Sequence, residues 1–114
     1  MPVPLFVDSS TLPSRSFSGA DSRGSLSQHL PMILNSAAYQ TGAVFITWDE
    51  AATGDGPIGM IVLSPFAKGA GYQNSIHYTH GSTLRTFQEI FGVTPFLGDA
   101  ANQTDLSDLF AVFP

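Results

Sequence analysis

Two adjacent carboxylates, Asp49 and Glu50, follow a short apolar run, residues 43–48, that ends in Thr47-Trp48. The run is rich in β-branched and aromatic side chains, which is typical of a strand buried on both faces of a sheet. Ligands of open α/β sheets bind outside the carboxyl ends of the strands. Carboxylate oxygens at such a place suit a hard divalent cation, or a borderline one such as zinc. The pair therefore indicates a metal site at the end of this strand.

A shared cation requires the backbone to bend after Asp49, because adjacent side chains of an extended strand point to opposite faces of the sheet. The small residues of the stretch 51–56 allow such a bend. The alternative interpretation is that Asp49 and Glu50 form a polar strand end in solvent, as Asp-Glu pairs at strand ends often do. The spacing by itself leaves both interpretations open.

The histidines are the next candidates for chemistry. His80 precedes Gly81 and Ser82, so we expect its imidazole near the N-terminus of the following helix, where anions such as phosphate are favoured. The alternative is an exposed or capping loop residue. His77, in the same loop, and His29, at the edge of an amphipathic helix, have less support from their spacing.

Other polar residues nearby show no catalytic pattern. Ser64 precedes a proline without elbow glycines or a neighbouring base, which is typical of a turn residue. Lys68 could meet a substrate phosphate, but its context favours a solvated loop lysine. Residues 69–71 are glycine-rich, yet they lack the Gly-Lys-Ser/Thr ending of a phosphate-binding loop.

Few elements are available to position these residues. We expect two adjacent strands, in parallel or mixed pairing, at residues 43–48 and 58–63, and helices near residues 31–39 and 82–91. The order helix, strand, strand, helix predicts an α/β fold with a small sheet of two or three short strands and flanking helices.

The ends of the helices carry local signals. Pro31 suits the first turn of the first helix, where a missing N–H costs nothing. Ser82 or Thr83 is expected to cap the second helix, and Gly92 to end it. Residues 105–110 predict one short helical turn.

The segment before the first helix reads differently. Residues 7–25 are rich in Ser, Gly and Asp and are interrupted by glycines and a proline. We therefore expect a flexible N-terminal arm over residues 1–24 and one α/β segment over residues 25–114.

Composition excludes several classes of protein. The chain has 114 residues, 43% of them hydrophobic and 11% charged, which argues for one small folded domain rather than disorder. A net charge of -5 without a Lys/Arg cluster argues against a nucleic-acid-binding module. The absence of cysteine excludes disulfides, zinc–thiolate sites and cysteine nucleophiles.

The sequence also shows no pattern typical of a secretory signal or a membrane span. The first residues lack the basic region of a secretory signal, and no run approaches the roughly 18 apolar residues that span a bilayer. The expectation is a soluble chain without a signal peptide, whose compartment the sequence does not specify.

Four segments, in order, resemble one family of enzymes. The segments are FITWDE at residues 45–50, IVLSPFAKGAG at 61–71, YTHGSTLRT at 78–86 and LGDAA at 97–101. They are similar to ITWDE, VLSPFAKGAGY, YTHYSLLRTVEDIFGL and LGDAA…DLSDLF of phosphoesterases of the acid phosphatase/phospholipase C type, in the alkaline-phosphatase-like superfamily. Residues 30–39 also resemble the family's ILNSPAY segment. The resemblance covers roughly residues 24–110, and the ordered series is more specific than any one segment.

The resemblance implies roles for the candidate residues. Asp49 and Glu50 would coordinate a catalytic divalent metal, and His80 would contact the metal or the phosphate. The implied fold is part of an alkaline-phosphatase-like sheet. The implied substrates are phosphate mono- or diesters, either small molecules or phospholipid headgroups, and members of the family are often exported. Gly81 departs from the family, in which an aromatic residue is frequent, and this predicts looser local packing.

A larger departure concerns the N-terminal half of the family. That half supplies a Glu-Asn metal-binding motif, often followed by Arg-Ser-Phe, and a Ser or Thr nucleophile. No glutamate precedes Glu50 here. We therefore expect a truncated, metal-ligand-bearing C-terminal part that binds its metal weakly and hydrolyses little alone, and whose partner is the missing half or a second copy. The alternatives are a non-catalytic α/β interaction or structural module, and a remnant without a selected function.

Overall fold

The computed structural model describes residues 4–6, 19–54 and 56–113, with the backbone alone for residues 4–6 and 19–22. The chain divides into two compact units, Met1–Pro65 and Phe66–Pro114. Each unit has its own helix and its own buried residues, so each is described by itself. The expected division into an N-terminal arm and one α/β segment over residues 25–114 stays a prediction, and residue 24 lies inside a helix.

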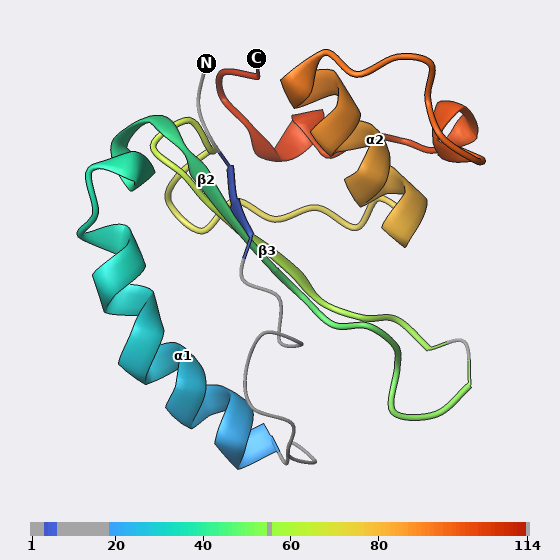
Figure 1. The fold of residues 1–114 in the computed structure, drawn as a ribbon. Helices are drawn as coiled ribbons and strands as arrows, with labels where there is room; N and C mark the ends of the chain where they lie inside the picture. Colours follow the sequence, from blue (N-terminus) through green and yellow to red (C-terminus); the bar gives the residue numbers. More distant parts are fainter. Residues whose placement is uncertain (1–3, 7–18, 55, 114) are drawn as a thin grey trace. The chain divides into compact units, whose positions relative to one another are not determined.

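The first unit contains a three-stranded mixed sheet (Figure 1). Its order is β1 (Pro4–Phe6), β2 (Ala43–Thr47) and β3 (Met60–Leu63), with β2 in the centre. β1 pairs with β2 in parallel, whereas β3 pairs with it antiparallel. Ala43, Val44, Phe45 and Ile46 of β2 are all buried. These features confirm an α/β fold with a small sheet and a strand buried on both faces.

The two expected strands are adjacent and pair antiparallel within a mixed sheet, which confirms the mixed alternative, whereas parallel pairing between them is wrong. Phe45 lies opposite Val62, and Thr47 opposite Met60. The physical reason lies in the connection, because parallel neighbours require a crossover, which is usually a helix. The described residues of the connection 48–59 contain no helix, so the chain turns back directly as a long-looped hairpin.

The first helix, α1, spans Gly19–Leu34 and contains Pro31 in its last turn. The expected helix at residues 31–39 is therefore wrong in its bounds, since α1 begins twelve residues earlier than Pro31 and is followed by a separate 3-10 turn, η2 (Ala38–Thr41). Proline lacks an N–H and opposes further α-helix, and here only three helical residues follow it. Residues 7–18 of the expected arm lie outside the described residues, while 19–24 form the first turns of α1.

Both ends of the β2–β3 hairpin are fastened by side-chain contacts. Thr47 Oγ1 donates to the carbonyl of Gly59 at 2.7 Å, beside the loop. At the other end, Ser64 Oγ donates to the carbonyl of Gly42 at 2.7 Å. The hydroxyl of Ser64 thus joins the two strands at the open end of the hairpin, and Ser64 directly precedes the turn at Pro65 and Phe66.

The second unit is organised by α2, which spans His80–Phe91. Thr79 caps it with a capping box, in which Ser82 N–H bonds Thr79 Oγ1 and Thr79 N–H bonds Ser82 Oγ. The expected cap at Ser82 or Thr83 is therefore wrong, because Ser82 is the reciprocal partner three residues inside the helix. Gly92 ends the helix in the left-handed region (φ 65°), which confirms the predicted stop.

The C-terminal segment wraps back onto α2 and onto the start of the unit. Two 3-10 turns follow α2, η3 (Ala100–Asn102) and η4 (Ser107–Leu109), and η4 confirms the short helical turn expected within residues 105–110. Backbone hydrogen bonds join Lys68 N–H to Leu109 O and Ala111 N–H to Phe66 O. The buried apolar residues of the unit come from α2 and this segment, namely Ile90, Ala100, Leu106 and Phe110.

No helix among the described residues is long and apolar enough to cross a membrane.

Candidate functional site

The carboxylate pair of the first unit lies at a bend directly after β2. Asp49 and Glu50 are both exposed, and the backbone leaves the extended conformation at these two residues. The N–H of Glu50 donates to Asp49 Oδ1 at 2.9 Å, which orients the Asp49 carboxylate toward the bend. The bend that a shared cation requires after the strand is therefore present.

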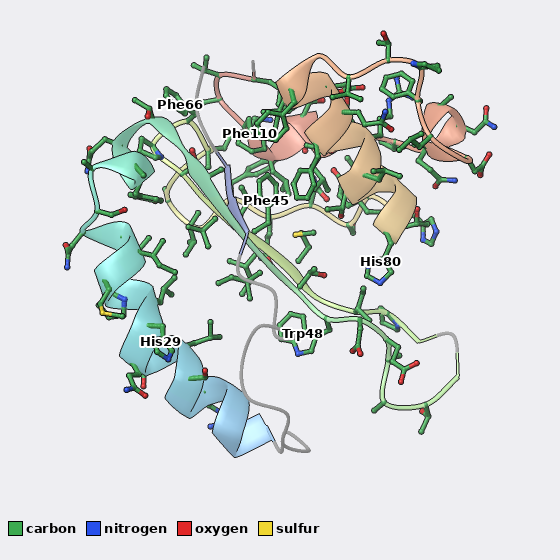
Figure 2. The ribbon with its side chains drawn as sticks, viewed as in Figure 1. His29, Phe45, Trp48, Phe66, His80 and Phe110 are labelled. Atoms are coloured by element: carbon green, nitrogen blue, oxygen red, sulfur yellow. The ribbon has the colours of Figure 1, made fainter. Side chains whose placement is uncertain are left out.

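Trp48 packs at the base of this bend. A Cβ built on Gly59 would overlap the Trp48 ring at Cζ3, so the indole lies directly against the Gly59 backbone. Trp48 is the only tryptophan of the chain, and its position in the hairpin is visible in Figure 2. The Thr47 hydroxyl also bonds the Gly59 carbonyl, so both residues that precede Asp49 contact Gly59 on the opposite arm of the hairpin.

The donor set fits part of a divalent metal site. Carboxylate oxygens are the ligands that hard divalent cations prefer, and two adjacent exposed carboxylates can supply two or more of them. Among the described residues, however, no group of three His, Cys, Asp or Glu side chains could hold a metal ion together. A cation at Asp49 and Glu50 would thus draw its remaining ligands from water or from groups outside that set.

His80 belongs to the second unit, where it is the first residue of α2 and is exposed. Figure 2 shows its side chain at the start of the helix. The predicted position near a helix N-terminus is therefore confirmed. Because Asp49 and Glu50 belong to the first unit, their assembly with His80 into one site stays a prediction.

Gly81, next to His80, allows a close approach rather than loose packing. A Cβ at this position would lie 2.7 Å from Cγ of Gln103. Gln103 Oε1 accepts a hydrogen bond from Thr79 Oγ1 at 2.8 Å, and Gln103 Nε2 donates to Asp99 Oδ2 at 2.7 Å. The space of a side chain at Gly81 is occupied by Gln103, so the expectation of looser packing is wrong.

The remaining histidines lie on other elements than the carboxylate pair. His29 is half-buried on α1, as expected for the edge of a helix, and His77 is exposed in the loop before α2. Neither belongs to a group of potential ligands among the residues that the structure describes.

Lys68 is not simply a solvated lysine. Its Nζ lies 3.2 Å from Asp108 Oδ1 and 4.6 Å from the centre of the Tyr72 ring. Asp108 Oδ2 also accepts hydrogen bonds from Tyr72 OH at 2.6 Å and from Asn74 Nδ2 at 2.8 Å. These bonds, from Tyr72 first, hold the pKa of Asp108 below its usual value. Sequence spacing could not reveal this cluster, since 34 to 40 residues separate Asp108 from its partners.

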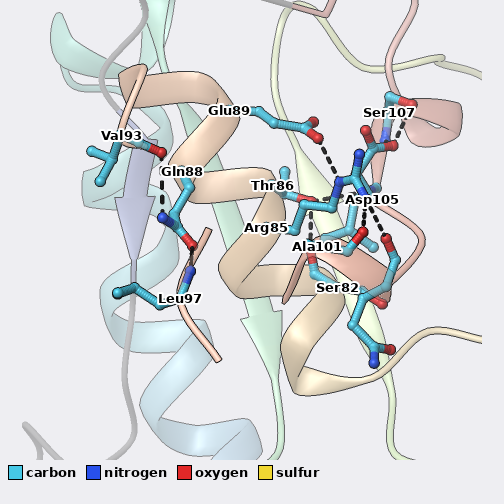
Figure 3. Close-up of polar contacts among 12 residues, drawn as sticks. Ser82, Arg85, Thr86, Gln88, Glu89, Val93, Leu97, Ala101, Asp105 and Ser107 are labelled. Carbon is cyan, nitrogen blue, oxygen red and sulfur yellow. Dashed lines mark hydrogen bonds and ion pairs between the residues drawn. The ribbon is translucent and has the colours of Figure 1, made fainter. Parts of the chain in front are cut away.

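A second polar cluster lies between α2 and the C-terminal segment (Figure 3). Arg85 Nε donates to Glu89 Oε1 at 2.7 Å, and Arg85 Nη1 donates to the carbonyls of Ala101 and Gln103. Burial and a hydrogen bond with Asp105 raise the pKa of Glu89. The i,i+4 spacing of Arg85 and Glu89 was the one signal in the sequence that pointed to this cluster.

Comparison of the chain with family models, with curated proteins and with solved structures gave no match.

One triplet of the sequence matches part of the motif that the resemblance implies for the N-terminal half. Residues 15–17 read Arg-Ser-Phe, the triplet that often follows Glu-Asn in the phosphoesterases that the chain resembles, but Pro13 and Ser14 stand where Glu-Asn would precede it. The triplet lies outside the described residues. The metal-binding part of that motif remains missing.

Proposed function

We propose that the chain is the metal-ligand-bearing part of a metal-dependent phosphoesterase, in which Asp49 and Glu50 hold a divalent cation. The observation that carries this proposal is the exposed carboxylate pair at a bend directly after a buried central strand. The ordered resemblance of four segments to one phosphoesterase family supports it independently. The partial alkaline-phosphatase-like sheet belongs to the same proposal, since the mixed sheet alone is common to many folds.

The residues would act by holding and orienting rather than by attacking. A divalent cation on the pair would supply a Lewis acid that polarises phosphoryl oxygens. Asp49 is oriented by the Glu50 N–H, and both follow a strand end fixed by Thr47 and Trp48. His80, at the N-terminus of α2, stands where a phosphate is favoured by the helix dipole.

Neither serine within the resembling segments is placed as a nucleophile. Ser64 Oγ is bonded to the Gly42 carbonyl, and Ser82 is buried in the capping box of α2. The proposal therefore assigns the nucleophile to residues outside those segments, and it assigns substrates of the phosphate mono- or diester class without choosing between small molecules and phospholipid headgroups.

Metal binding is the direct test. Titration of the ¹⁵N-labelled chain with Mn²⁺ should broaden the amide signals of residues 48–51 at low metal-to-protein ratio, because the paramagnetic ion relaxes nearby nuclei. The double variant Asp49→Asn/Glu50→Gln should lose this local broadening. Asp99→Asn, which removes another exposed carboxylate, is the matched control and should keep it. Equal broadening in the double variant would exclude the site.

A non-catalytic interaction module is the second candidate. The observation that favours it is a set of exposed apolar side chains at the C-terminal end of α2 and in the turn that follows it, Phe91, Val93 and Leu97. Large apolar residues that gather at a surface often mark contacts with other proteins. Sedimentation of the chain with and without Mn²⁺ separates the two candidates, since self-association that Leu97→Asp abolishes, together with no metal binding, would favour the module.

A further inference from the structure

Gln103 links the start of α2 to the segment that follows the helix. Its Oε1 accepts a hydrogen bond from Thr79 Oγ1 at 2.8 Å, and its Nε2 donates to Asp99 Oδ2 at 2.7 Å. Its backbone carbonyl accepts a bond from Arg85 Nη1 at 3.1 Å. The residue is thus held by its side chain and by its backbone, and it joins the capping residue of α2 to a carboxylate beyond the helix.

Asp99 determines which way the side-chain amide of Gln103 points. A carboxylate only accepts hydrogen bonds, whereas an amide donates through nitrogen and accepts through oxygen. The nitrogen must therefore face Asp99, which leaves the oxygen facing Thr79. With the amide reversed, its oxygen would lie against the carboxylate, and the bond between them would be lost.

The Thr79 hydroxyl takes its direction from this amide. Because Gln103 presents an oxygen, the hydroxyl donates its one proton there. The lone pairs of Oγ1 remain for the capping box, in which the N–H of Ser82 donates to Oγ1 at 3.3 Å. The donors therefore run in one direction, from Ser82 through Thr79 and Gln103 to the carboxylate. These four residues form a one-way series of hydrogen bonds, the Asp99 relay.

Gly81 provides the space that the Asp99 relay occupies. A Cβ at this position would lie 2.7 Å from Cγ of Gln103 and 3.3 Å from Thr79 Oγ1. Carbon atoms in favourable contact are about 3.5–4.0 Å apart, so a side chain at position 81 would push Gln103 away from Thr79. The sequence thus combines a glycine in the first turn of α2 with a long amide side chain on the facing segment.

We propose that Asp99 and Gln103 are positioning residues, which set the start of α2 and with it the place of His80 through the Asp99 relay. His80 is the first residue of α2 and directly follows Thr79, so the cap fixes the backbone from which its imidazole projects. This inference rests on the proposed function, in which His80 meets a phosphate. Asp99 and Gln103 act on His80 through Thr79 rather than by contact with a substrate.

The Asp99 relay has a spectroscopic signature in the chain without ligand. A side-chain amide proton of Gln103 that binds a carboxylate should resonate downfield of the amide protons of exposed glutamines. Asp99→Ala removes the acceptor, so this downfield shift should be lost and the Hε1 signal of the His80 imidazole should move. A Gln103 amide signal at the position of exposed glutamines in the native chain would overturn the proposal without any variant.

Two pairs of variants distinguish the relay from a general effect on stability. Thr79→Val removes the hydroxyl and should move the His80 signal as Asp99→Ala does, while Thr79→Ser keeps the hydroxyl and should retain the native signal. Asn102→Ala removes only the other donor to Asp99, which binds Oδ1 at 2.6 Å, and should also retain it. A His80 signal that is unmoved in Asp99→Ala, or that moves equally in Asn102→Ala, would overturn the proposal.

Titration with inorganic phosphate tests the link to the proposed function. Gln103→Met keeps the net charge but removes both side-chain bonds, so a displaced His80 should weaken phosphate binding about two- to tenfold, the net effect of one lost hydrogen bond. Amide shifts of residues 80–82 measure the dissociation constant, and Asn102→Ala should bind as the native chain does. Equal binding by Gln103→Met and the native chain would overturn the positioning role. If no protein responds to phosphate while His80 moves as expected in Asp99→Ala, the relay is supported and the role of His80 in the proposed function fails.

Discussion

Buried polar side chains form hydrogen bonds to backbone groups inside the second unit. Gln88 is buried and donates through Nε2 to the carbonyls of Val93 and Pro95, while its Oε1 accepts the N–H of Leu97. Thr86 is fully buried, donates to Ser82 O and accepts the N–H of Leu106. Every buried side-chain nitrogen or oxygen of the described residues has a partner. Removing one partner therefore leaves a backbone group unsatisfied, which costs more than the lost bond itself.

Thr86→Val tests this directly. The substitution keeps the shape of the side chain but removes the acceptor of the Leu106 N–H, so we expect the free energy of unfolding to fall by about 1–3 kcal/mol. Urea denaturation followed by circular dichroism measures the change. Thr83→Val, on the same helix at a half-buried position, is the control and should cost clearly less. Equal losses in the two variants would mean that the buried hydrogen bond contributes nothing.

Asp108 provides a pH-dependent prediction. Its pKa is held low by the bonds from Tyr72, Asn74 and Lys68, so its contribution to stability is present above its unfolded pKa and is lost as the pH falls through the folded pKa. Asp108→Asn should therefore lower the urea midpoint at neutral pH and flatten its decline on acidification. Tyr72→Phe removes one donor of the three and should give a smaller change of the same sign. A decline in Asp108→Asn as steep as in the native chain would contradict this role.

At the scale of elements, the connection between two strands decides how a site residue is presented. The β2–β3 hairpin holds the strand end before Asp49 through the contact of Trp48 with the Gly59 backbone. The two residues lie on opposite arms of the hairpin, just beyond the last paired residues, Thr47 and Met60. Glycine at position 59 is required by this close approach rather than by an unusual backbone angle.

Gly59→Ala should displace the indole of Trp48. We expect a change in tryptophan fluorescence and a loss of about 1–3 kcal/mol in unfolding free energy, the usual range for overpacking. Because Trp48 is the only tryptophan, the emission reports this position alone. Gly69→Ala, where a Cβ would meet nothing within 4 Å, should leave both measurements unchanged. An unaltered emission spectrum in Gly59→Ala would show that the contact is absent in solution.

The whole molecule consists of two units, and the proposed activity needs groups that neither unit is shown to supply. Phosphoryl transfer requires a nucleophile and a charge-stabilising group held in register. Asp49 and Glu50 provide oxygen ligands in the first unit, and His80 provides an imidazole in the second. The hydroxyl of Ser64 donates to the Gly42 carbonyl, and that of Ser82 belongs to the capping box of α2.

Hydrolysis of p-nitrophenyl phosphate by the 114-residue chain should accordingly be negligible, even with added divalent metal. Supplying the N-terminal half of a related phosphoesterase, fused or in trans, should restore turnover, and Asp49→Ala should then abolish it. Release of p-nitrophenol measures both. Robust metal-dependent turnover by the chain alone that disappears in Ser64→Ala or Ser82→Ala would show that the nucleophile lies within it.

Local sequence signals were sufficient to predict several elements, including the strand that precedes the carboxylate pair. The apolar β-branched run of residues 43–47 determined a buried strand, and glycine determined the end of α2 at Gly92, because only glycine adopts its left-handed conformation at little cost. The place of His80 at a helix start followed from its neighbours in the chain, whereas the small residues 51–56 only permitted the bend at Asp49 and Glu50.

Only the tertiary structure decided how these elements are joined. The antiparallel direction of β3, the choice of Thr79 as the cap and the long α1 each depend on which of several permitted local conformations the fold selects. The clusters around Asp108 and Glu89 join residues 16 to 40 positions apart. Such contacts leave no period or motif in the sequence. The residue type of an aspartate does not show whether its carboxylate is free in solvent or accepts three hydrogen bonds, because distant segments supply the donors only after the chain has folded.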